Sequence, residues 1–453
     1  MNAVGALILV SVILTVFFTS RRIALLGMMA GVLYLTQGQQ ITVLGFNLYA
    51  TRFIELAGFI RVVSKKEFKF RRLNGIDLSL IFLYGFTTII FLLRSKESQA
   101  YQIGVAVDAF LCYFTFRGLI TGIDDFRWFL RAFLRLLAPY VVLILFESFT
   151  RKNPFAFMGG LEYGDWLREG RLRCQGSFRH ASLLGTLGAS FLPLYIGLGF
   201  SKVDRGRAIF GIVLCMLIVW ASNSGGPLNC AAIALVGWAL WAVRSKMQLV
   251  RRGAIAAIAA LAVTMKAPIW YLPAKASALT GGDGWHRSYL MDMAFQNFDK
   301  WGLAGMPIQD TWNWFPYGIA VTGGADITNQ FLSFGLDSGL LGISLFILLL
   351  VVGFVKLGKA LRSVRAYDVS RASEPLLWGL GVMLTAHIFN WLGITYFDQT
   401  YVIWFMQLAA ISSLTEQCIG KSVRGSTEPI DGLLDIRDSF DGDLAGMDTM
   451  PRA

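Results

Sequence analysis

The chain has 453 residues, of which 55% are hydrophobic and only 15% are charged, and its formal net charge is +12. A soluble domain carries about 25% charged residues, so the composition excludes a soluble globular protein. Because lipid offers the backbone no hydrogen bonds, we expect an all-α polytopic membrane protein. The positive charge does not indicate nucleic-acid binding, since most Lys and Arg residues lie in short connections between apolar runs.

Twelve or thirteen apolar runs approach the length of about 20 residues that a helix needs to cross a bilayer. The expected spans are 3–19, 23–37, 41–60, 76–94, 102–120, 128–147, 181–200, 208–222, 229–243, 253–267, 338–358, 376–392 and 398–415. The first is interpreted as a retained span rather than a signal peptide, because no Lys or Arg precedes it.

Some expected spans contain charged residues. The third carries Arg52 and Glu55 one helical turn apart, which favours an amphipathic or partly re-entrant segment. Asp108 lies in the middle of another span. Since an unpaired charge in lipid is costly, we expect Arg52 or Arg117 to be its partner.

Basic clusters divide the connections into two classes. The connections 61–72, 201–207, 244–252 and 356–371 are rich in Lys and Arg, so the positive-inside rule predicts that they are cytoplasmic. The alternate connections 148–180, 221–228 and 268–337 then face outward. Residues 1–415 form the transmembrane domain. The remainder, 416–453, is predicted to be a disordered cytoplasmic tail, with seven acidic residues and one Arg between Glu428 and Asp448.

The first long outer connection, 148–180, is strongly basic. Its cationic side chains are Arg151, Lys152, Arg168, Arg171, Arg173 and Arg179. Arginine suits bidentate recognition of phosphate oxygens, and a polyprenyl diphosphate would present such oxygens at this depth. A solvated surface is the alternative interpretation.

The second long outer connection, 268–337, is rich in aromatic residues. They include Trp270, Trp285, Trp301, Trp312 and Trp314, together with Tyr271, Tyr289, Phe315, Tyr317 and Phe331. Such rings suit the apolar faces of sugars. They also suit plain packing or an interfacial belt, and the sequence leaves both open.

Four short motifs resemble the O-antigen ligase and O-antigen polymerase superfamily. They are the Arg173, Gly176, Phe178, His180 and Gly185 run; Ser222 to Gly226; Arg287 and Tyr289 followed by Trp301 to Gly305; and Thr328, Asn329, Phe331 and Leu332 leading to Asp337, Gly339 and Gly342. The motifs occur in the family's order on the predicted outer face. Two positions depart from the family pattern: Thr328 stands where a histidine is common, and Gly225 stands where an arginine is common.

The resemblance implies transfer of a glycan from a polyprenyl-diphosphate-linked oligosaccharide to an acceptor glycan or a lipid A core. It implies a multi-pass protein of the bacterial inner membrane with a cytoplasmic C-terminus. No metal and no other cofactor is expected, and polysaccharide export proteins are expected partners. The implied roles are diphosphate binding by Arg173, Arg179 and Arg287; base catalysis by Asp326, His286 or His180; and substrate positioning by Ser224, Thr328 and Asn329.

Three other classes stay open. A lipid-linked glycan transporter would also have 12 to 14 spans, but it should have paired halves or broken helices, which the sequence does not indicate. A shape-family peptidoglycan glycosyltransferase also has a large outer loop. An inactive relative that scaffolds an export complex is the third, given Thr328 and Gly225.

Overall fold

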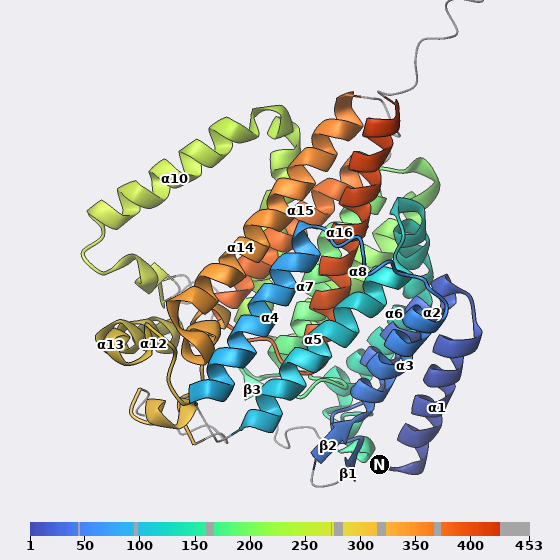
Figure 1. Cartoon of the computed structure of the whole chain (residues 1–453), viewed down its shortest axis with the longest axis horizontal. Helices are drawn as coiled ribbons and strands as arrows, with labels where there is room; N and C mark the ends of the chain where they lie inside the picture. Colours follow the sequence, from blue (N-terminus) through green and yellow to red (C-terminus); the bar gives the residue numbers. More distant parts are fainter. Residues whose placement is uncertain are drawn as a thin grey trace, which may run out of the picture.

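The computed structural model describes residues 1–43, 46–94, 98–159, 167–272, 274–275, 284–314, 323–366 and 373–425, with side chains placed outside 42–47 and 421–425. Within these ranges the protein is an α-helical bundle with two small hairpins (Figure 1). The fold class predicted from the composition is therefore confirmed at the level of an all-α protein.

The longer helices run back and forth along the bundle (Figure 1). In chain order they are α1 (Ala3–Phe18), α2 (Arg21–Tyr34), α3 (Ala50–Ser64), α4 (Gly75–Arg94), α5 (Gln99–Leu119), α6 (Ile123–Thr150), α7 (Ala181–Leu198), α8 (Arg205–Ser222), α9 (Gly225–Ala239), α10 (Met247–Thr264), α14 (Gln330–Ala366), α15 (Glu374–Trp391) and α16 (Gln399–Gly425). Two further helices, α12 (Gly284–Gln296) and α13 (Phe298–Trp301), lie in the connection before α14.

Seven helical segments of the described chain are long and apolar enough to cross a membrane. They are Gly75–Arg94, Ile123–Thr150, Ala181–Leu198, Lys202–Ser222, Gly225–Thr264, Gln330–Ala366 and Gln399–Gly420, and the shorter Ala3–Phe18 is also apolar. This number is compatible with a multi-pass membrane protein. The larger number of spans predicted from hydropathy includes helices that are shorter or more polar, such as α2 and α15.

The expected span at 41–60 is wrong in its first half. Strand β1 (Gln40–Val43) pairs antiparallel with β2 (Phe46–Tyr49), and only then does α3 begin. The run is apolar enough to pass for a span, but its β-branched and aromatic residues also suit a strand pair. The second hairpin, β3 (Leu167–Arg168) with β4 (Arg171–Leu172), belongs to the first basic connection.

Helix α7 forms the centre of the bundle and packs against α8, α9 and α15. Two glycine–proline contacts allow the close crossing of α7 and α15. A Cβ atom on Gly197 would lie 2.8 Å from the Pro375 carbonyl oxygen, and one on Gly379 would lie 2.8 Å from the Pro193 carbonyl oxygen. Small residues at crossings of this kind let helix backbones approach closely.

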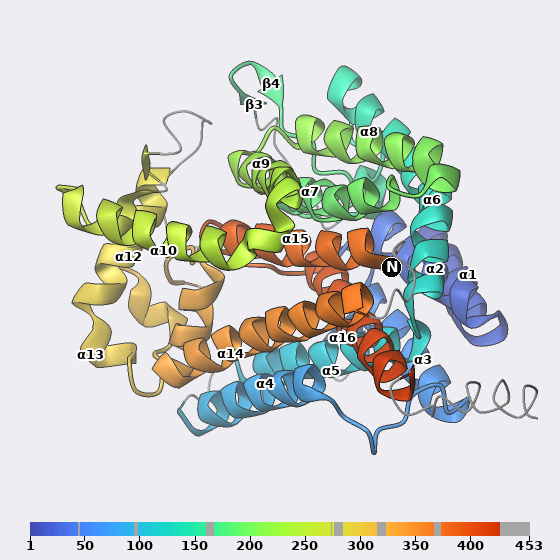
Figure 2. The same ribbon diagram turned by 90° about the horizontal axis from the view of Figure 1, so that it is seen from above.

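Helix α10 is the opposite case. It follows α9 through a short 3-10 turn (Leu240–Lys246) and extends away from the bundle (Figures 1 and 2). None of its described residues is buried, although its sequence is rich in Ala, Ile and Leu. An apolar helix exposed on all sides is suited to lipid rather than to water.

The described parts of the two classes of connection lie at opposite ends of the bundle (Figure 1). The end that carries 61–72, 201–207, 244–252 and 356–371 is called the basic end, and ion pairs tie its helices together. They include Arg22–Asp125, Arg117–Asp77, Arg131–Asp204 and Arg365–Glu374. The other end, called the site end, carries the described residues of 148–180, 221–228 and 268–337 (Figure 1).

One charged pair lies within the bundle, between α3 and α5. The Nε atom of Arg52 donates to both carboxylate oxygens of Asp108, at 2.9 and 3.1 Å. Its Nη2 atom donates to the same carboxylate at 2.9 Å. Arg52, rather than Arg117, is therefore the partner of Asp108.

Helix α14 is interrupted near the site end. Ser338 and Gly339 have non-helical backbone angles, and Gly339 has φ +73°. A Cβ atom on Gly339 would lie 2.3 Å from the Leu303 carbonyl oxygen. The segment Trp301 to Gly305 therefore inserts against the break, and the third and fourth sequence motifs touch each other. The sequence did not predict a broken helix.

Candidate functional site

The basic connection 148–180, here called the first segment, is anchored by a buried carboxylate. Glu147, only 3% exposed, lies in the last turn of α6. Its Oε1 atom accepts from the Gln175 backbone N–H at 3.0 Å, and its Oε2 atom accepts from the Gly176 N–H at 2.9 Å. Asn153 joins them, since its Nδ2 donates to Glu147 at 3.2 Å and to the Gly176 carbonyl at 2.9 Å. The turn that follows Arg173 is thereby fixed to the bundle.

Gly176 is required by this turn. Its φ is +58°, in the left-handed region that favours glycine. A Cβ atom here would also lie 2.4 Å from Ile144 Cδ1 and 2.6 Å from the Tyr140 hydroxyl. The glycine of the first sequence motif thus lets the chain pass close against α6.

His180 is the residue before α7 and caps that helix. Its Nδ1 atom accepts a hydrogen bond from the Ser182 N–H at 3.1 Å. Burial and the nearby Arg173 charge lower the pKa of His180 to about 4. The ring is then neutral at pH 7, with its proton on Nε2. This geometry favours a hydrogen-bond donor rather than a base.

Ser224 is the residue before α9 and lies beside the start of α7. The Ser224 and Ser182 hydroxyl oxygens lie 2.7 Å apart. Asn223, the preceding residue, donates through Nδ2 to the Arg168 and Arg171 carbonyls, at 2.9 and 3.3 Å. The second motif therefore lies directly beside the first, as an outer-end position of both predicts.

Arg179 forms a bidentate ion pair with Asp398, the residue before α16. The Nε–Oδ2 distance is 2.8 Å and the Nη2–Oδ1 distance is 2.6 Å. Burial raises the pKa of Asp398, and Arg179 opposes that rise. Arg179 is 43% exposed, so part of its guanidinium faces outward although its fork is occupied by a carboxylate.

The aromatic connection 268–337, here called the second segment, has an apolar core of its own. This cluster contains Leu290, Ala294, Trp301, Met306, Trp314, Ala325, Ile327, Leu332 and Leu336. Trp301 and Trp314 are 5% and 1% exposed. Plain packing is therefore confirmed for these two rings, whereas Trp312 is 60% exposed at the surface.

A stacked aromatic pair lies on α12, with Trp285 exposed and Tyr289 half-buried. Trp285 and Tyr289 stack with ring centroids 5.1 Å apart and planes 18° apart, and Trp285 is 45% exposed. His286 and Arg287 lie between them in sequence. Phe315 and Tyr317 lie outside the described residues.

Asp326, His286 and Arg287 lie close to one another. Burial raises the pKa of Asp326, while the charges of His286 and Arg287 oppose that rise. The Asp326 side chain is nevertheless exposed, His286 is buried and Arg287 is partly buried. A carboxylate flanked by two cationic or polarisable groups is thus open to an incoming molecule.

Asn329 and Thr328 precede α14. The Asn329 Oδ1 atom accepts from the Phe331 and Leu332 N–H groups at 3.0 and 3.1 Å, which makes it the helix cap. Its Nδ2 atom faces Met291 Sδ at 3.6 Å. The Thr328 hydroxyl is buried without a hydrogen-bond partner among the described residues. Asn329 thus has a structural role as a helix cap. Thr328 lies two residues after Asp326 in the sequence.

The connection between α15 and α16, residues 392–398, joins the two segments. A Cβ atom on Gly393 would lie 3.0 Å from Arg287 Nε, so the guanidinium packs closely against this glycine. The Thr395 hydroxyl donates to the Ile327 carbonyl at 2.5 Å, and the Tyr396 N–H donates to Gln330 Oε1 at 2.9 Å. Asp398 then holds Arg179. We call residues 392–398 the joining loop.

A buried hydrogen-bond network supports the joining loop from below. The Tyr396 hydroxyl lies 2.5 Å from His387 Nδ1 and accepts from Asn390 Nδ2 at 3.1 Å. His387 Nε2 lies 2.6 Å from Gln407 Oε1, and Asn390 also donates to the Thr186 hydroxyl at 2.9 Å. The bonded groups tie α15 to α7 and α16, although Asn390 Oδ1 and Gln407 Nε2 have no hydrogen-bond partner among the described residues.

Sequence reasoning missed Glu147 and the joining loop. Glu147 could have been suspected, because it is an acidic residue in the last turn of an apolar run. Asp398 and Gly393 gave no local signal, since their partners are 219 and 106 positions away. Among the described residues, no group of three or more His, Cys, Asp or Glu side chains could hold a metal ion.

At the site end, then, both arginine-bearing connections contact the joining loop, and Arg287 of the second lies near the exposed Asp326 carboxylate. Guanidinium groups can stabilise a phosphate leaving group, a carboxylate can accept a proton, and rings can carry a sugar face. No protein-family model matches the chain, and no curated protein matches it.

Proposed function

We propose that this protein is a membrane enzyme that transfers a glycan from a polyprenyl diphosphate carrier to an acceptor hydroxyl, at the outer face of a bacterial inner membrane. In this proposal the site end faces outward and the basic end faces the cytoplasm, as the distribution of Lys and Arg predicts. The acceptor is another lipid-linked glycan or a lipid A core.

The observation that carries the proposal is the meeting of both arginine-bearing segments at the joining loop. Arg287 lies against Gly393, and Arg179 is paired with Asp398 five residues later. Arg173 acts electrostatically on His180, next to Arg179 in the chain. Cations from separate segments at one end suit a ligand with two adjacent phosphates.

The reaction balances without a cofactor. The acceptor oxygen bonds to the anomeric carbon of the donor glycan while the bond from that carbon to the diphosphate oxygen breaks. The bonding electron pair leaves with the diphosphate, and Arg173 and Arg287 stabilise the charge that develops on it. The acceptor proton passes to a base.

Asp326 is the base that the surroundings favour. The Asp326 side chain is exposed to an incoming hydroxyl. Desolvation by the surrounding protein nevertheless raises the pKa of Asp326 above the ordinary value of 3.8. A carboxylate with a raised pKa is a stronger proton acceptor, yet His286 and Arg287 keep its charged form available. His286 is the second candidate, and the Trp285 and Tyr289 rings would carry a sugar ring beside it.

The test is transfer by purified protein, supplied with a polyprenyl-diphosphate oligosaccharide and an acceptor. Wild-type protein should extend or transfer the glycan. Arg287→Ala should lower the rate by about 10²–10³, the usual effect of removing one preorganised donor. Arg287→Lys should retain part of the activity, since it keeps the charge but loses the fork.

Lys300→Ala is the matched control. Lys300 is exposed on α13 of the same segment, and its ammonium donates to Asn297 at 2.8 Å. This variant should be as active as the wild type. No transfer by the wild type to either acceptor class, or full activity of Arg287→Ala, would remove the proposal.

One observation favours a second candidate, a transporter of lipid-linked glycans. The interruption of α14 at Ser338 and Gly339 is a feature of many transporters, although there it lies near the bilayer midplane. Sealed vesicles with the carrier on one side distinguish the two activities. Movement of the carrier across the bilayer without glycan transfer would support transport.

A further inference from the structure

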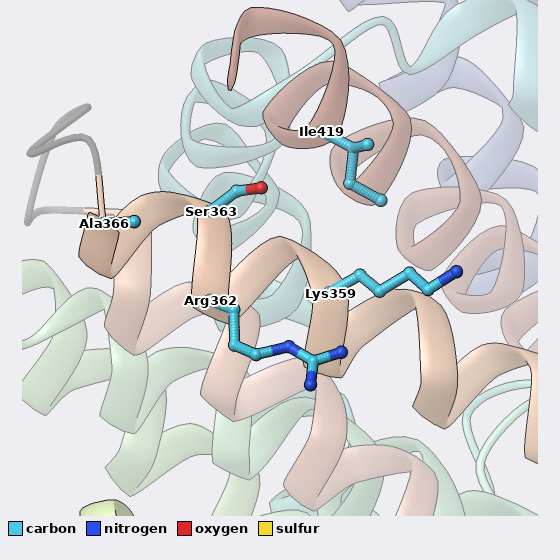
Figure 3. Close-up of a pocket in the computed structure, with 5 residues that line it drawn as sticks. All are labelled: Lys359, Arg362, Ser363, Ala366 and Ile419. Atoms are coloured by element: carbon cyan, nitrogen blue, oxygen red, sulfur yellow. The ribbon is translucent and has the colours of Figure 1, made fainter. Parts of the chain in front are cut away.

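An open surface cavity of about 350 Å³ lies at the basic end, lined by residues of α14 and by Ile419 of α16. Figure 3 shows the side chains that line it, which are Lys359, Arg362, Ser363, Ala366 and Ile419. Four of the five belong to α14. The cavity therefore combines two cations and a hydroxyl with a small apolar surface.

The acidic side chains nearby are already paired. Glu374 accepts from Arg365 Nε at 2.6 Å and lies 3.4 Å from Arg244 Nε. Glu416, one turn before Ile419, is paired with Arg117. Neither Lys359 nor Arg362 forms an ion pair with any residue of the described chain, so the cavity keeps a positive charge.

An exposed apolar stripe on α14 leads into the cavity. Leu348, Val351 and Val355 are 47%, 49% and 49% exposed. They precede Lys359 and Arg362 by helical steps of three or four residues, so all five share one face of the helix. One face of α14 thus presents an apolar surface that is followed, towards the basic end, by two cationic side chains.

We propose that this cavity binds the headgroup of an anionic phospholipid, with the lipid phosphate on Lys359 and Arg362 and one acyl chain along the apolar stripe. The inference rests on the bilayer placement in the proposed function, but not on its chemistry. Basic pockets between membrane helices at the cytoplasmic side are suited to anionic headgroups. The hydroxyl of Ser363 adds a neutral donor.

The apolar stripe distinguishes a lipid from other anions. A free phosphate would use the cations alone, and so would the acidic segment from Glu428 to Asp448 of this chain. Only a phospholipid presents an anion and a long hydrocarbon chain that match both features. The free anion and the acidic segment are therefore alternative outcomes of the test.

The test is native mass spectrometry of the purified full-length protein, titrated with phosphatidylglycerol or phosphatidylcholine. Phosphatidylglycerol should be retained, and Lys359→Ala with Arg362→Ala should weaken its retention about tenfold or more. Val351→Gln with Val355→Gln should weaken it too. Arg251→Ala with Arg252→Ala is the control pair, since both are exposed on α10 away from the cavity.

Three outcomes would overturn the inference. One is equal retention of phosphatidylglycerol by the wild type and the Lys359/Arg362 variant, with unchanged thermal unfolding. Another is displacement of the lipid by equimolar glycerol phosphate, which would indicate a site for free phosphate. The third is a tenfold gain in retention when the seven acidic residues after position 427 become amides, which would make the acidic segment the occupant. None of these results bears on glycan transfer.

Discussion

The two segments that carry the candidate site are attached to the bundle in different ways. The first is held by hydrogen bonds from its own backbone to a buried carboxylate, Glu147, and by helix caps at α7. The second has its own apolar core, including Trp301 and Trp314, and touches the joining loop through Arg287 and Ile327.

This difference predicts that the two segments have different roles in the proposed reaction. A segment fixed by hydrogen bonds to buried groups holds its side chains in one place, which suits a binding site for a diphosphate. A segment with its own core can carry a base and aromatic rings as one preformed unit. Changes in the first should therefore disturb the bundle itself, whereas changes in the second should disturb the reaction.

Substitution of Glu147 should have the largest effect. Glu147→Ala leaves the Gln175 and Gly176 N–H groups buried without an acceptor, at about 1–3 kcal/mol each. We expect a lower thermal unfolding temperature in detergent and loss of glycan transfer together. Glu147→Gln keeps one carbonyl acceptor and should restore part of both. A normal unfolding temperature of Glu147→Ala would show that the first segment is not held to the bundle by this carboxylate.

Asp326 should control the rate without affecting stability. Because only its charged form accepts a proton, the transfer rate should fall as the pH drops through its raised pKa, and the midpoint should lie above the ordinary 3.8. Asp326→Asn should lower the rate by about 10²–10⁴ and leave unfolding unchanged. If the pH dependence persists in Asp326→Asn but is absent from His286→Asn, the base is His286.

His180 should give the smallest effect, mainly on stability. His180→Ala removes the cap of α7 and should cost about 0.5–2 kcal/mol, whereas His180→Asn can still cap. The pKa of His180 falls from 6.5 to about 4 on folding, so the folded protein binds fewer protons. Its contribution is present above pH 6.5 and is lost as the pH falls towards 4. Unfolding of both variants at pH 7.5 and pH 5 checks this.

Much of the helical framework could be predicted because it depends on local properties. Apolar runs predicted α1, α4, α6, α7 and α8 closely, and the charge pattern separated the two kinds of connection. The pairing of Asp108 followed from the cost of a lone charge in lipid. The β1–β2 hairpin and the exposure of α10 were missed, because hydropathy does not distinguish a helix from a strand or show whether a helix packs.

The candidate site could be predicted only in part. Arg173, Arg287 and Asp326 were chosen from the sequence, and the last two lie together. Arg179 was chosen for phosphate, but its fork is held by Asp398. The joining loop could not be predicted, because Gly393 and Tyr396 act through contacts with residues far away in the chain. Asn329 shows that a polar residue before a helix is often a cap.

Gln399 has a consequence for how the protein is made. This fully buried side chain donates through Nε2 to the Leu35 and Ser177 carbonyls, both at 3.0 Å. It therefore joins the connection after α2 and the turn before α7 to the start of α16. Those carbonyls lack this partner until residue 399 has been synthesised.

In the proposed membrane setting, the helices made before residue 399 would lie in lipid with this interface still incomplete. Long-range contacts of this kind close late and slowly. A chain whose synthesis stops before residue 399 would lack the hydrogen bonds of Gln399 at the site end. Synthesis of the start of α16 is thus the step that completes these hydrogen bonds at the site end.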